Sequence, residues 1–131
     1  MTDGASSRSE RPQLAPTAEH PITLTPTGGR VVVRAGAAVI ADTHAALTLQ
    51  ESDYPAVQYI PLSDVDQGKL VRSAHTTYCP YKGEAGYYGL VVDEDVIADA
   101  VWEYQQPYPA VGAIAGHVAF YPDRADIVVS R

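Results

Sequence analysis

Hydrophobic and polar residues alternate with a period of two over several short stretches of this chain. Clear examples are residues 22–25 (Ile-Thr-Leu-Thr) and residues 56–60 (Ala-Val-Gln-Tyr-Ile). Such alternation sends successive side chains to opposite faces of a strand, so that one face can be buried. Residues 30–34 (Arg-Val-Val-Val-Arg) add a β-branched run, which favours strand structure. The pattern therefore predicts short β-strands.

Turn-forming residues separate these stretches and predict that neighbouring strands pair antiparallel. Thr27-Gly28-Gly29 follows the first strand, and Pro122-Asp123 lies between the last two. Residues 96–104 fit a helix or a strand, and we interpret them as a strand. Further strands are expected at residues 38–41, 46–50, 69–73, 87–92, 117–121 and 127–129. The predicted fold class is mainly β, with at most one or two short helical turns, one of them at residues 63–66.

The N-terminal residues do not follow this pattern. Residues 1–18 are rich in Ser, Pro and Arg and lack an apolar period, so they cannot bury enough surface to offset the entropy lost on ordering. We expect them to be a flexible N-terminal tail. Residues 19–131 are expected to form a single β-rich domain, because their number suits one hydrophobic core.

Charge and hydropathy indicate which partners the protein can bind among nucleic acids, small anions and membranes. Nine Lys and Arg residues against 16 Asp and Glu residues give a formal net charge of -7, which opposes binding of a nucleic-acid strand. A few converging donors would still suffice for one small anion; the candidates are Arg30, Arg34, Arg72 and Lys82. No stretch approaches the roughly 18 apolar residues of a membrane span and no secretory signal is visible, so we expect a cytoplasmic location and no membrane partner.

Candidate chemistry is concentrated in residues 77–83 (Thr-Tyr-Cys-Pro-Tyr-Lys-Gly), which we expect to form a loop between two strands. This segment holds the only cysteine, Cys79, and one of the two lysines, Lys82. A lone cysteine forms neither an internal disulfide nor a multi-thiolate zinc site, and we expect no metal and no cofactor. Cys79 is either a thiolate nucleophile or redox centre beside a cation, or a small buried residue packed against tyrosines.

Three other polar residues are candidates to act with Cys79, and each has two interpretations. Lys82 is an anion clamp or amine nucleophile, or a lysine paired with Glu51 or Glu84. His75 shares a strand face with Thr77 and Cys79 if the segment stays extended. It is either a general base or an ordinary hydrogen-bonded residue. Glu51 comes directly after a predicted strand. It is either an acid/base group or the salt-bridge partner of Lys82.

Tyrosine supplies most of the aromatic bulk of the chain, with nine Tyr residues against one Trp and one Phe. These rings either fill the core or wall a pocket for a planar ligand. The ligand-binding candidates, aromatic and polar, are Tyr59, Arg72, Thr77, Tyr81, Gly83, Tyr88, Trp102 and Tyr104.

Several motifs together resemble one family. They are Glu51-Ser52 with Tyr54-Pro55, Tyr59-Ile60-Pro61, Thr77-x-Cys79-Pro80-Tyr81-Lys82-Gly83, Ala85 with Tyr87-Tyr88, Trp102-x-Tyr104 with Pro107, and Ala119-Phe120-Tyr121. Over about residues 20–131 the chain resembles the domain of unknown function 427 family, which carries a nucleotidyltransferase-like label. The resemblance implies a compact antiparallel barrel- or tent-like β domain, with residues 79–83 lining its characteristic face.

The nucleotidyltransferase-like label implies a Mg²⁺ ion held by paired carboxylates beside a Gly-Ser turn. Asp64 and Asp66 have a suitable spacing, but the chain contains no Gly-Ser dipeptide, and we do not expect this activity.

Three functions are consistent with these observations. The first is binding of a small anionic or planar molecule in a pocket built from Glu51, Tyr59, His75, Cys79, Lys82 and Trp102. The second is an enzyme that uses the same pocket, with Cys79 as nucleophile or redox thiol, His75 as its base and Lys82 as electrostatic stabiliser. The third is a non-catalytic protein-interaction module. The sequence does not predict the oligomeric state.

Overall fold

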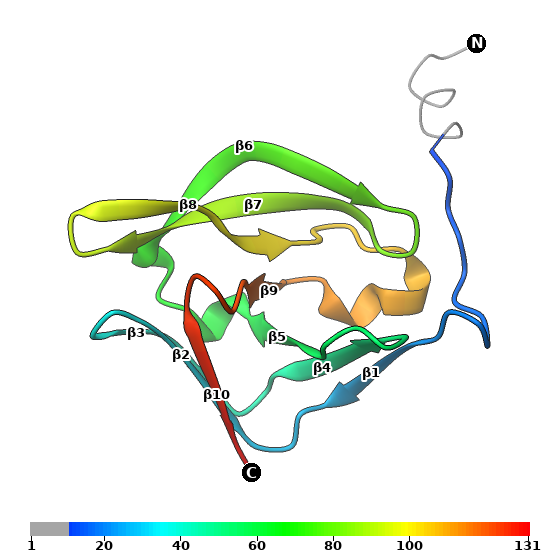
Figure 1. The fold of residues 1–131 in the computed structure, drawn as a ribbon, viewed down its shortest axis with the longest axis horizontal. Coiled ribbons are helices and arrows are strands. Elements are labelled where there is room, and N and C mark those ends of the chain that lie inside the picture. Colours follow the sequence, from blue (N-terminus) through cyan, green and yellow to red (C-terminus); the bar gives the residue numbers. More distant parts are fainter. Residues whose placement is uncertain (1–10) are drawn as a thin grey trace.

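Ten strands in two antiparallel sheets form the fold of residues 11–131, the part of the chain that this computed structural model describes (Figure 1). The larger sheet has the order β1 (Ile22–Pro26), β4 (Leu47–Glu51), β5 (Val57–Pro61), β9 (His117–Phe120), β8 (Asp95–Glu103), β7 (Gly83–Val92) and β6 (Leu70–Cys79). The smaller sheet has the order β10 (Asp126–Ser130), β2 (Arg30–Ala35) and β3 (Ala38–Thr43). The prediction of a mainly β, antiparallel fold is confirmed.

The seven-stranded sheet is bent rather than closed. Figure 1 shows β6, β7 and β8 in one layer and β1, β4 and β5 in another, with β9 between them. Strand β9 joins the layers because it pairs with β5 through Ile60 and Val118 and with β8 through Val101 and Phe120. The edge strands β1 and β6 do not pair with each other, so the expected barrel is not closed. The fold is an open, bent sheet.

Helical structure in residues 11–131 is limited to three short 3-10 segments: η1 (Leu62–Asp64), η2 (Gln67–Lys69) and η3 (Pro109–Ile114). The predicted helical turn at residues 63–66 overlaps η1. Asp66 caps η2, because its side chain accepts a hydrogen bond of 3.2 Å from the backbone nitrogen of Gly68. These described residues include no helix with the length and apolarity that a membrane span requires.

Two hydrophobic clusters lie on opposite faces of the central strands. The aliphatic cluster, which faces the three-stranded sheet, includes Val31, Val33, Ile40, Ile60, Leu90, Ala100, Val101, Val118 and Phe120. The aromatic cluster, which packs against η3, includes Leu49, Tyr59, Ala85, Tyr87, Tyr104, Val111, Ile114 and Ala119. Adjacent residues such as Tyr59 and Ile60 fall in different clusters because successive side chains of a strand point to opposite faces.

Residues 77–83 form a tight hairpin and not the expected loop. Strand β6 continues to Cys79 and β7 starts at Gly83, so only residues 80–82 lie between them. The backbone nitrogen of Lys82 donates to the carbonyl of Cys79 at 3.2 Å, which closes the turn. The prediction failed because β6 is an exposed edge strand whose polar residues show no alternation with apolar ones.

Part of the predicted N-terminal tail contacts this hairpin. The backbone nitrogen of Leu14 donates to the carbonyl of Pro80 at 2.9 Å, and the hydroxyl of Tyr78 donates to the carbonyl of Pro12 at 2.6 Å. Residues 1–10 of the predicted tail lie outside the described residues.

Candidate functional site

A partly buried ion cluster joins the β6–β7 hairpin to the end of β4. The Lys82 ammonium donates to the Glu51 carboxylate at 2.5 Å, and the other oxygen of Glu51 lies 2.7 Å from Nε2 of His20. Lys82 is only 8% exposed. A buried ammonium is tolerated where a carboxylate neutralises it at hydrogen-bond distance. Glu51 therefore forms a salt bridge with Lys82, one of its two predicted interpretations, and His20 is a third member of the ion cluster.

The strand register explains why His20 reaches this cluster. Ile22 of β1 pairs with Glu51 of β4, which places the residues just before β1 beside the Glu51 carboxylate. The backbone nitrogen of Ser52 donates to the carbonyl of Pro21 at 2.9 Å and fixes this entry to the sheet. The imidazole of His20 also stacks on the ring of Tyr81, with centroids 4.2 Å apart.

Two opposing effects act on the ionisation of Glu51. Partial burial alone raises the pKa of its carboxyl, because the charged form loses hydration. The hydrogen bonds from Lys82 and His20 outweigh burial and hold the pKa of Glu51 below its ordinary value. The carboxylate is therefore ionised at neutral pH.

Cys79 lies beside this cluster. Its sulfur is 3.8 Å from the Lys82 ammonium, and its side chain packs against the aromatic cluster. The thiol is partly buried. Cys79 thus lies between the Lys82 ammonium and the aromatic cluster.

A small cavity opens next to the ion cluster and is called the inner cavity here. Its volume is about 220 Å³. It is lined by Leu49, Glu51, Tyr54, Pro55, Val57, Tyr59, Lys82, Tyr87, Trp102, Tyr104 and Tyr121. Most of the wall is aromatic, and the ion pair supplies the charged groups. The predicted pocket residues Glu51, Tyr59 and Lys82 thus meet, together with Trp102 and Tyr104, whereas Cys79 does not line the cavity.

Hydrogen bonds and ring contacts fix the aromatic wall. The indole nitrogen of Trp102 donates to the hydroxyl of Tyr59 at 3.1 Å, and the two rings are perpendicular. Trp102 also contacts the ring of Tyr121, with centroids 4.5 Å apart. A wall of interlocked rings presents a preformed, rigid surface to a planar ligand.

Three tyrosines that line the cavity, Tyr59, Tyr104 and Tyr121, have raised pKa values. Burial, followed by the influence of the neighbouring Tyr59, raises the pKa of Tyr104. Burial also raises the pKa of Tyr59, although the hydrogen bond from Trp102 opposes it. For Tyr121, burial and the adjacent hydroxyl of Tyr87 raise the pKa to about 12. These hydroxyls are therefore hydrogen-bonding groups and not charges at neutral pH.

His75 lies apart from the ion cluster. As the alternation predicted, His75, Thr77 and Cys79 share the inner face of β6, where Thr77 shares a 2.9 Å hydrogen bond with the hydroxyl of Tyr87. The His75 ring lies 4.6 Å from the ring of Tyr87, and no hydrogen bond in residues 11–131 joins it to Cys79 or Lys82. The imidazole next to the ion pair is that of His20.

The remaining candidates are divided between other surfaces. Arg72 and Gly83 line a separate groove on the outer face of the β6–β7 hairpin, and the ring of Tyr88 lies beneath the Arg72 guanidinium, 4.7 Å from its carbon. Tyr81 covers His20. Sequence reasoning did not select His20, which only the register of β1 against β4 would have revealed. Tyr87 and Tyr121 belong to the tyrosines that were expected to fill the core or wall a pocket, and both line the inner cavity.

The paired aspartates of the nucleotidyltransferase-like label have structural partners. Asp64 accepts a 2.6 Å hydrogen bond from Thr43, and Asp66 caps η2. Within residues 11–131 no three His, Cys, Asp or Glu side chains are placed to hold a metal ion together.

The sequence was compared with models of protein families. The model described as "Domain of unknown function (DUF427)" matches residues 23–131. The chain belongs to the DUF427 family. This match confirms the resemblance seen in the sequence motifs and includes Glu51, Cys79 and Lys82, whereas His20 precedes it. No curated protein matches the chain.

Proposed function

We propose that this DUF427 domain binds a small planar molecule that carries an anionic or hydrogen-bond-accepting group. The observation that carries the proposal is the inner cavity, in which aromatic rings surround the edge of a buried Lys82–Glu51 pair. Concave aromatic sites with a few fixed polar groups are the usual form of small-molecule pockets.

The volume of the inner cavity limits the size of the ligand. An apolar cavity of about 150 Å³ holds one benzene ring, and drug-sized ligands occupy about 300–1,000 Å³. At about 220 Å³, the inner cavity suits a single ring with one small substituent. A complete nucleotide exceeds this size.

The ion cluster selects the substituent. A lysine ammonium has three hydrogen-bond donors, of which Glu51 and the Cys79 sulfur take two. The third donor serves a ligand carboxylate or carbonyl. When His20 is protonated, two cations face one carboxylate, and a single negative charge on the ligand balances the cluster.

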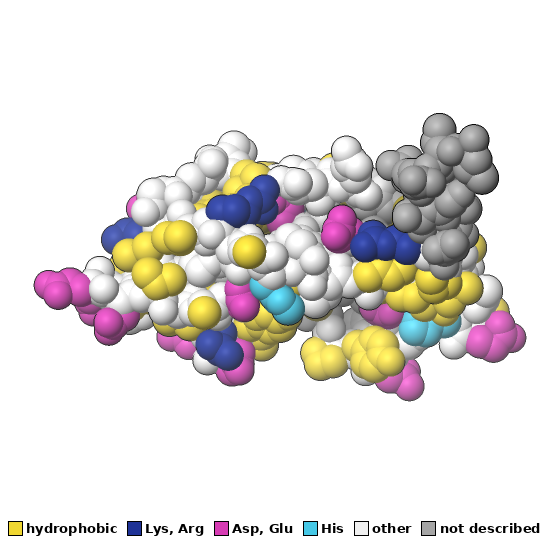
Figure 2. Space-filling model, turned by 90° about the horizontal axis from the view of Figure 1, so that it is seen from above, with side chains coloured by type: hydrophobic (Ala, Val, Ile, Leu, Met, Phe, Trp, Pro, Cys, Tyr) yellow, Lys and Arg dark blue, Asp and Glu magenta, His cyan; other side chains and the backbone are white. Residues whose placement is uncertain are grey.

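A nucleic-acid strand does not suit this surface. The chain has a net charge of -7, and Figure 2 shows acidic and basic side chains dispersed over the visible face rather than gathered in a basic band. Strand binding depends on a continuous positive surface.

A thermal-shift screen tests the proposal. Single-ring carboxylates such as benzoate, nicotinate and 4-hydroxybenzoate are compared with their neutral amides. At 100 times its dissociation constant a ligand adds about 2.7 kcal/mol of stability, and we expect carboxylates to exceed amides.

Val57→Phe, which fills the inner cavity, should abolish the stabilisation, and Val128→Phe, on an exposed position of β10, should leave it unchanged. If no ligand stabilises the protein, or if the ligands stabilise Val57→Phe as much as the native protein, binding in this cavity is contradicted. Either result favours a protein-interaction module.

A second candidate function is covalent chemistry at Cys79, which the 3.8 Å approach of Lys82 favours. Iodoacetamide provides a simple probe, since the sulfur forms a bond to carbon and iodide leaves. If Lys82 activates the thiol, alkylation near neutral pH is faster in the native chain than in Lys82→Met, by about tenfold or more. Equal rates in the two proteins contradict this function.

A further inference from the structure

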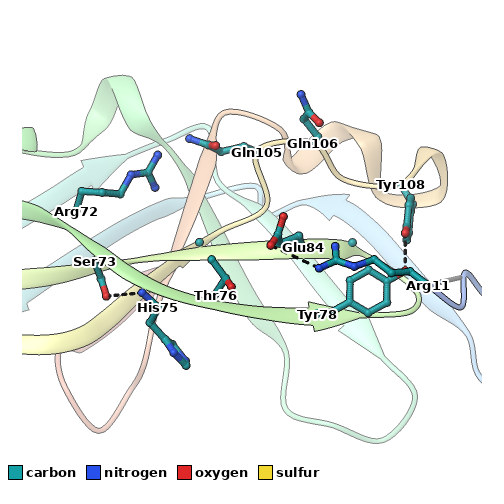
Figure 3. A pocket seen from close by; sticks show the side chains of 12 residues that line it. Arg11, Arg72, Ser73, His75, Thr76, Tyr78, Glu84, Gln105, Gln106 and Tyr108 are labelled. Atoms are coloured by element: carbon teal, nitrogen blue, oxygen red, sulfur yellow. Dashed lines mark hydrogen bonds and ion pairs between the residues drawn. The ribbon is translucent and has the colours of Figure 1, made fainter. Parts of the chain in front are cut away.

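A second hollow lies on the opposite face of the β6–β7 hairpin and is called the outer groove here. Its volume is about 540 Å³, more than twice that of the inner cavity. Figure 3 shows Gln105 and Gln106 along one side, Thr76 and Glu84 along the other, and Tyr78 and Tyr108 at one end. The His75 ring points away from it.

The irregular pairing of β6 with β7 creates this groove. Arg72 pairs with Tyr88 and Thr76 with Gly86, so residues 73–75 of β6 face only Tyr87 of β7. Strand β6 therefore arches away from β7, as Figure 1 shows. Ser73 fixes the arch, because its hydroxyl donates to Asp99 at 2.6 Å and accepts from the backbone nitrogen of His75 at 3.1 Å. The arch is a built feature of the sheet.

Glycine keeps the floor of the groove open. Gly86 lies between Glu84 and Tyr88 on the outward face of β7 and contributes no side chain there. A Cβ atom at Gly86 would lie 3.3 Å from the Arg72 guanidinium. Gly86 therefore lets a ligand approach the backbone of the sheet.

Each guanidinium in the groove has a carboxylate partner. Arg72 lies 3.8 Å from the buried Glu103, which also accepts a 2.7 Å hydrogen bond from Tyr88. Arg11 lies 3.7 Å from Glu84. The charges of the groove are therefore balanced, so it selects neutral ligands over multiply charged anions.

The remaining polar groups of the groove are uncharged hydrogen-bonding groups. The amides of Gln105 and Gln106 and the hydroxyl of Thr76 each donate and accept hydrogen bonds, as a hydroxyl does. Tyr108, with Tyr78 beside it, supplies an apolar ring at the end of the groove.

We propose that the outer groove is a second binding site, separate from the inner cavity, for a neutral, hydroxyl-rich ligand of the carbohydrate class. The groove holds more than a single sugar ring. Sugar hydroxyls bond to the two glutamine amides and to the outward edge of Arg72, and the apolar face of a ring lies over Gly86 toward Tyr108.

Amide chemical-shift mapping of the full chain tests this proposal. Maltotriose, cellotriose and N,N′-diacetylchitobiose are titrated as neutral probes, with glucose 6-phosphate as the charged control. At least one neutral probe should cause saturable shifts at the amides of Gly86, Gln105 and Gln106, and none at Leu49 or Val57 of the inner cavity. No saturable shift with any neutral probe, or shifts with the phosphate alone, overturn the proposal.

Variants assign the binding to the groove. The double variant of Gln105→Ala and Gln106→Ala removes two exposed amides and should weaken binding about tenfold. Gln67→Ala removes an exposed amide of η2 outside the groove and should leave affinity unchanged within about twofold. Gly86→Ala, which fills the floor, should also weaken binding. Equal effects of the double variant and of Gln67→Ala overturn the proposal.

Discussion

The aliphatic and aromatic clusters differ although the same central strands build both. The members of the aliphatic cluster in β5, β8 and β9 are aliphatic or Phe. Their immediate neighbours face the inner cavity and include Tyr59 and Trp102, whose polar tips bond to each other. One face of the sheet is thus devoted to stability, and the other leaves space and places charged and hydrogen-bonding groups beside it. A candidate site is therefore found by asking which of two buried faces carries polar atoms.

Substitutions at two adjacent residues of β5 test this difference between the clusters most directly. They include the largest expected effect on the free energy of unfolding. Ile60→Ala in the aliphatic cluster should lower the free energy of unfolding by about 4 kcal/mol, because it deletes a fully buried side chain and leaves a cavity. Tyr59→Phe, one residue earlier, removes only the hydroxyl that accepts from Trp102 and should cost about 1 kcal/mol.

Urea denaturation measures both free energies. Ligand stabilisation at the inner cavity should survive in Ile60→Ala once its lower baseline stability is taken into account. Similar losses of stability in the two variants would contradict the division of the core into two functions.

Substitution of Lys82 tests whether the ion cluster both stabilises the aromatic face and selects the ligand. Lys82→Met should destabilise the protein by about 2–3 kcal/mol, since it leaves the partly buried Glu51 with only His20 as a partner. Adding Glu51→Gln should recover part of this loss, because an uncharged amide is less costly to bury without the ammonium.

Urea denaturation of the two single variants and the double variant gives the coupling energy. Additive effects would show that the pair contributes little. A screen of the same proteins should show that preference for carboxylates over amides disappears without Lys82.

The alternation of the sequence predicted the strands well where one or both faces are buried. Tyr59 and Ile60 lie in a strand that was recognised in this way, and the strand interpretation of residues 96–104 is confirmed by β8. The sequence pattern predicted only residues 69–73 of β6 and missed the rest of the strand, because an edge strand exposed on one side tolerates polar residues at nearly every position. The pairing of Lys82 with Glu51 was among the predicted alternatives, since a chain with two lysines offers few partners.

The composition of the site depended on features that local sequence does not contain. His20 reaches Glu51 only through the register of β1 on β4, a contact over 31 residues. Tyr87 and Tyr88 are neighbours, and the period of two separates them: Tyr87 faces the inner cavity and Tyr88 supports Arg72 on the other face. The sequence predicted that both rings fill the core or wall a pocket, and which face is hollow follows from packing alone.

High pH should destabilise the aromatic face selectively. The pKa values of Tyr59 and Tyr104 are raised above 10.0, chiefly by burial, so the folded state keeps protons that the unfolded state releases. Their contribution is complete below pH 10 and is lost as pH rises through the folded pKa values, at up to about 1.4 kcal/mol per pH unit for each group. The free energy of unfolding at pH 11 should therefore be about 2 kcal/mol lower than at pH 9.

Tyr59→Phe should reduce this alkaline loss by up to half, because Phe has no proton to release. Urea denaturation at a series of pH values gives the comparison. An alkaline loss of the same size in Tyr59→Phe would show that the loss arises elsewhere in the molecule.

Low pH should act on the ion cluster, with the smallest expected effect. The pKa of Glu51 is held below its ordinary value of 4.5, so the stabilisation it provides is complete above that pH and is lost as pH falls through the folded pKa. Glu51 is only partly buried, so the expected loss is about 1 kcal/mol or less. Glu51→Gln should flatten the acid limb of the stability curve, whereas Arg30→Ala, which breaks the exposed Arg30–Asp42 pair, should leave it nearly unchanged. If Arg30→Ala flattened the curve as much as Glu51→Gln, burial of the ion cluster would not be the source of acid sensitivity, and the aromatic face would lose its electrostatic distinction from the rest of the molecule.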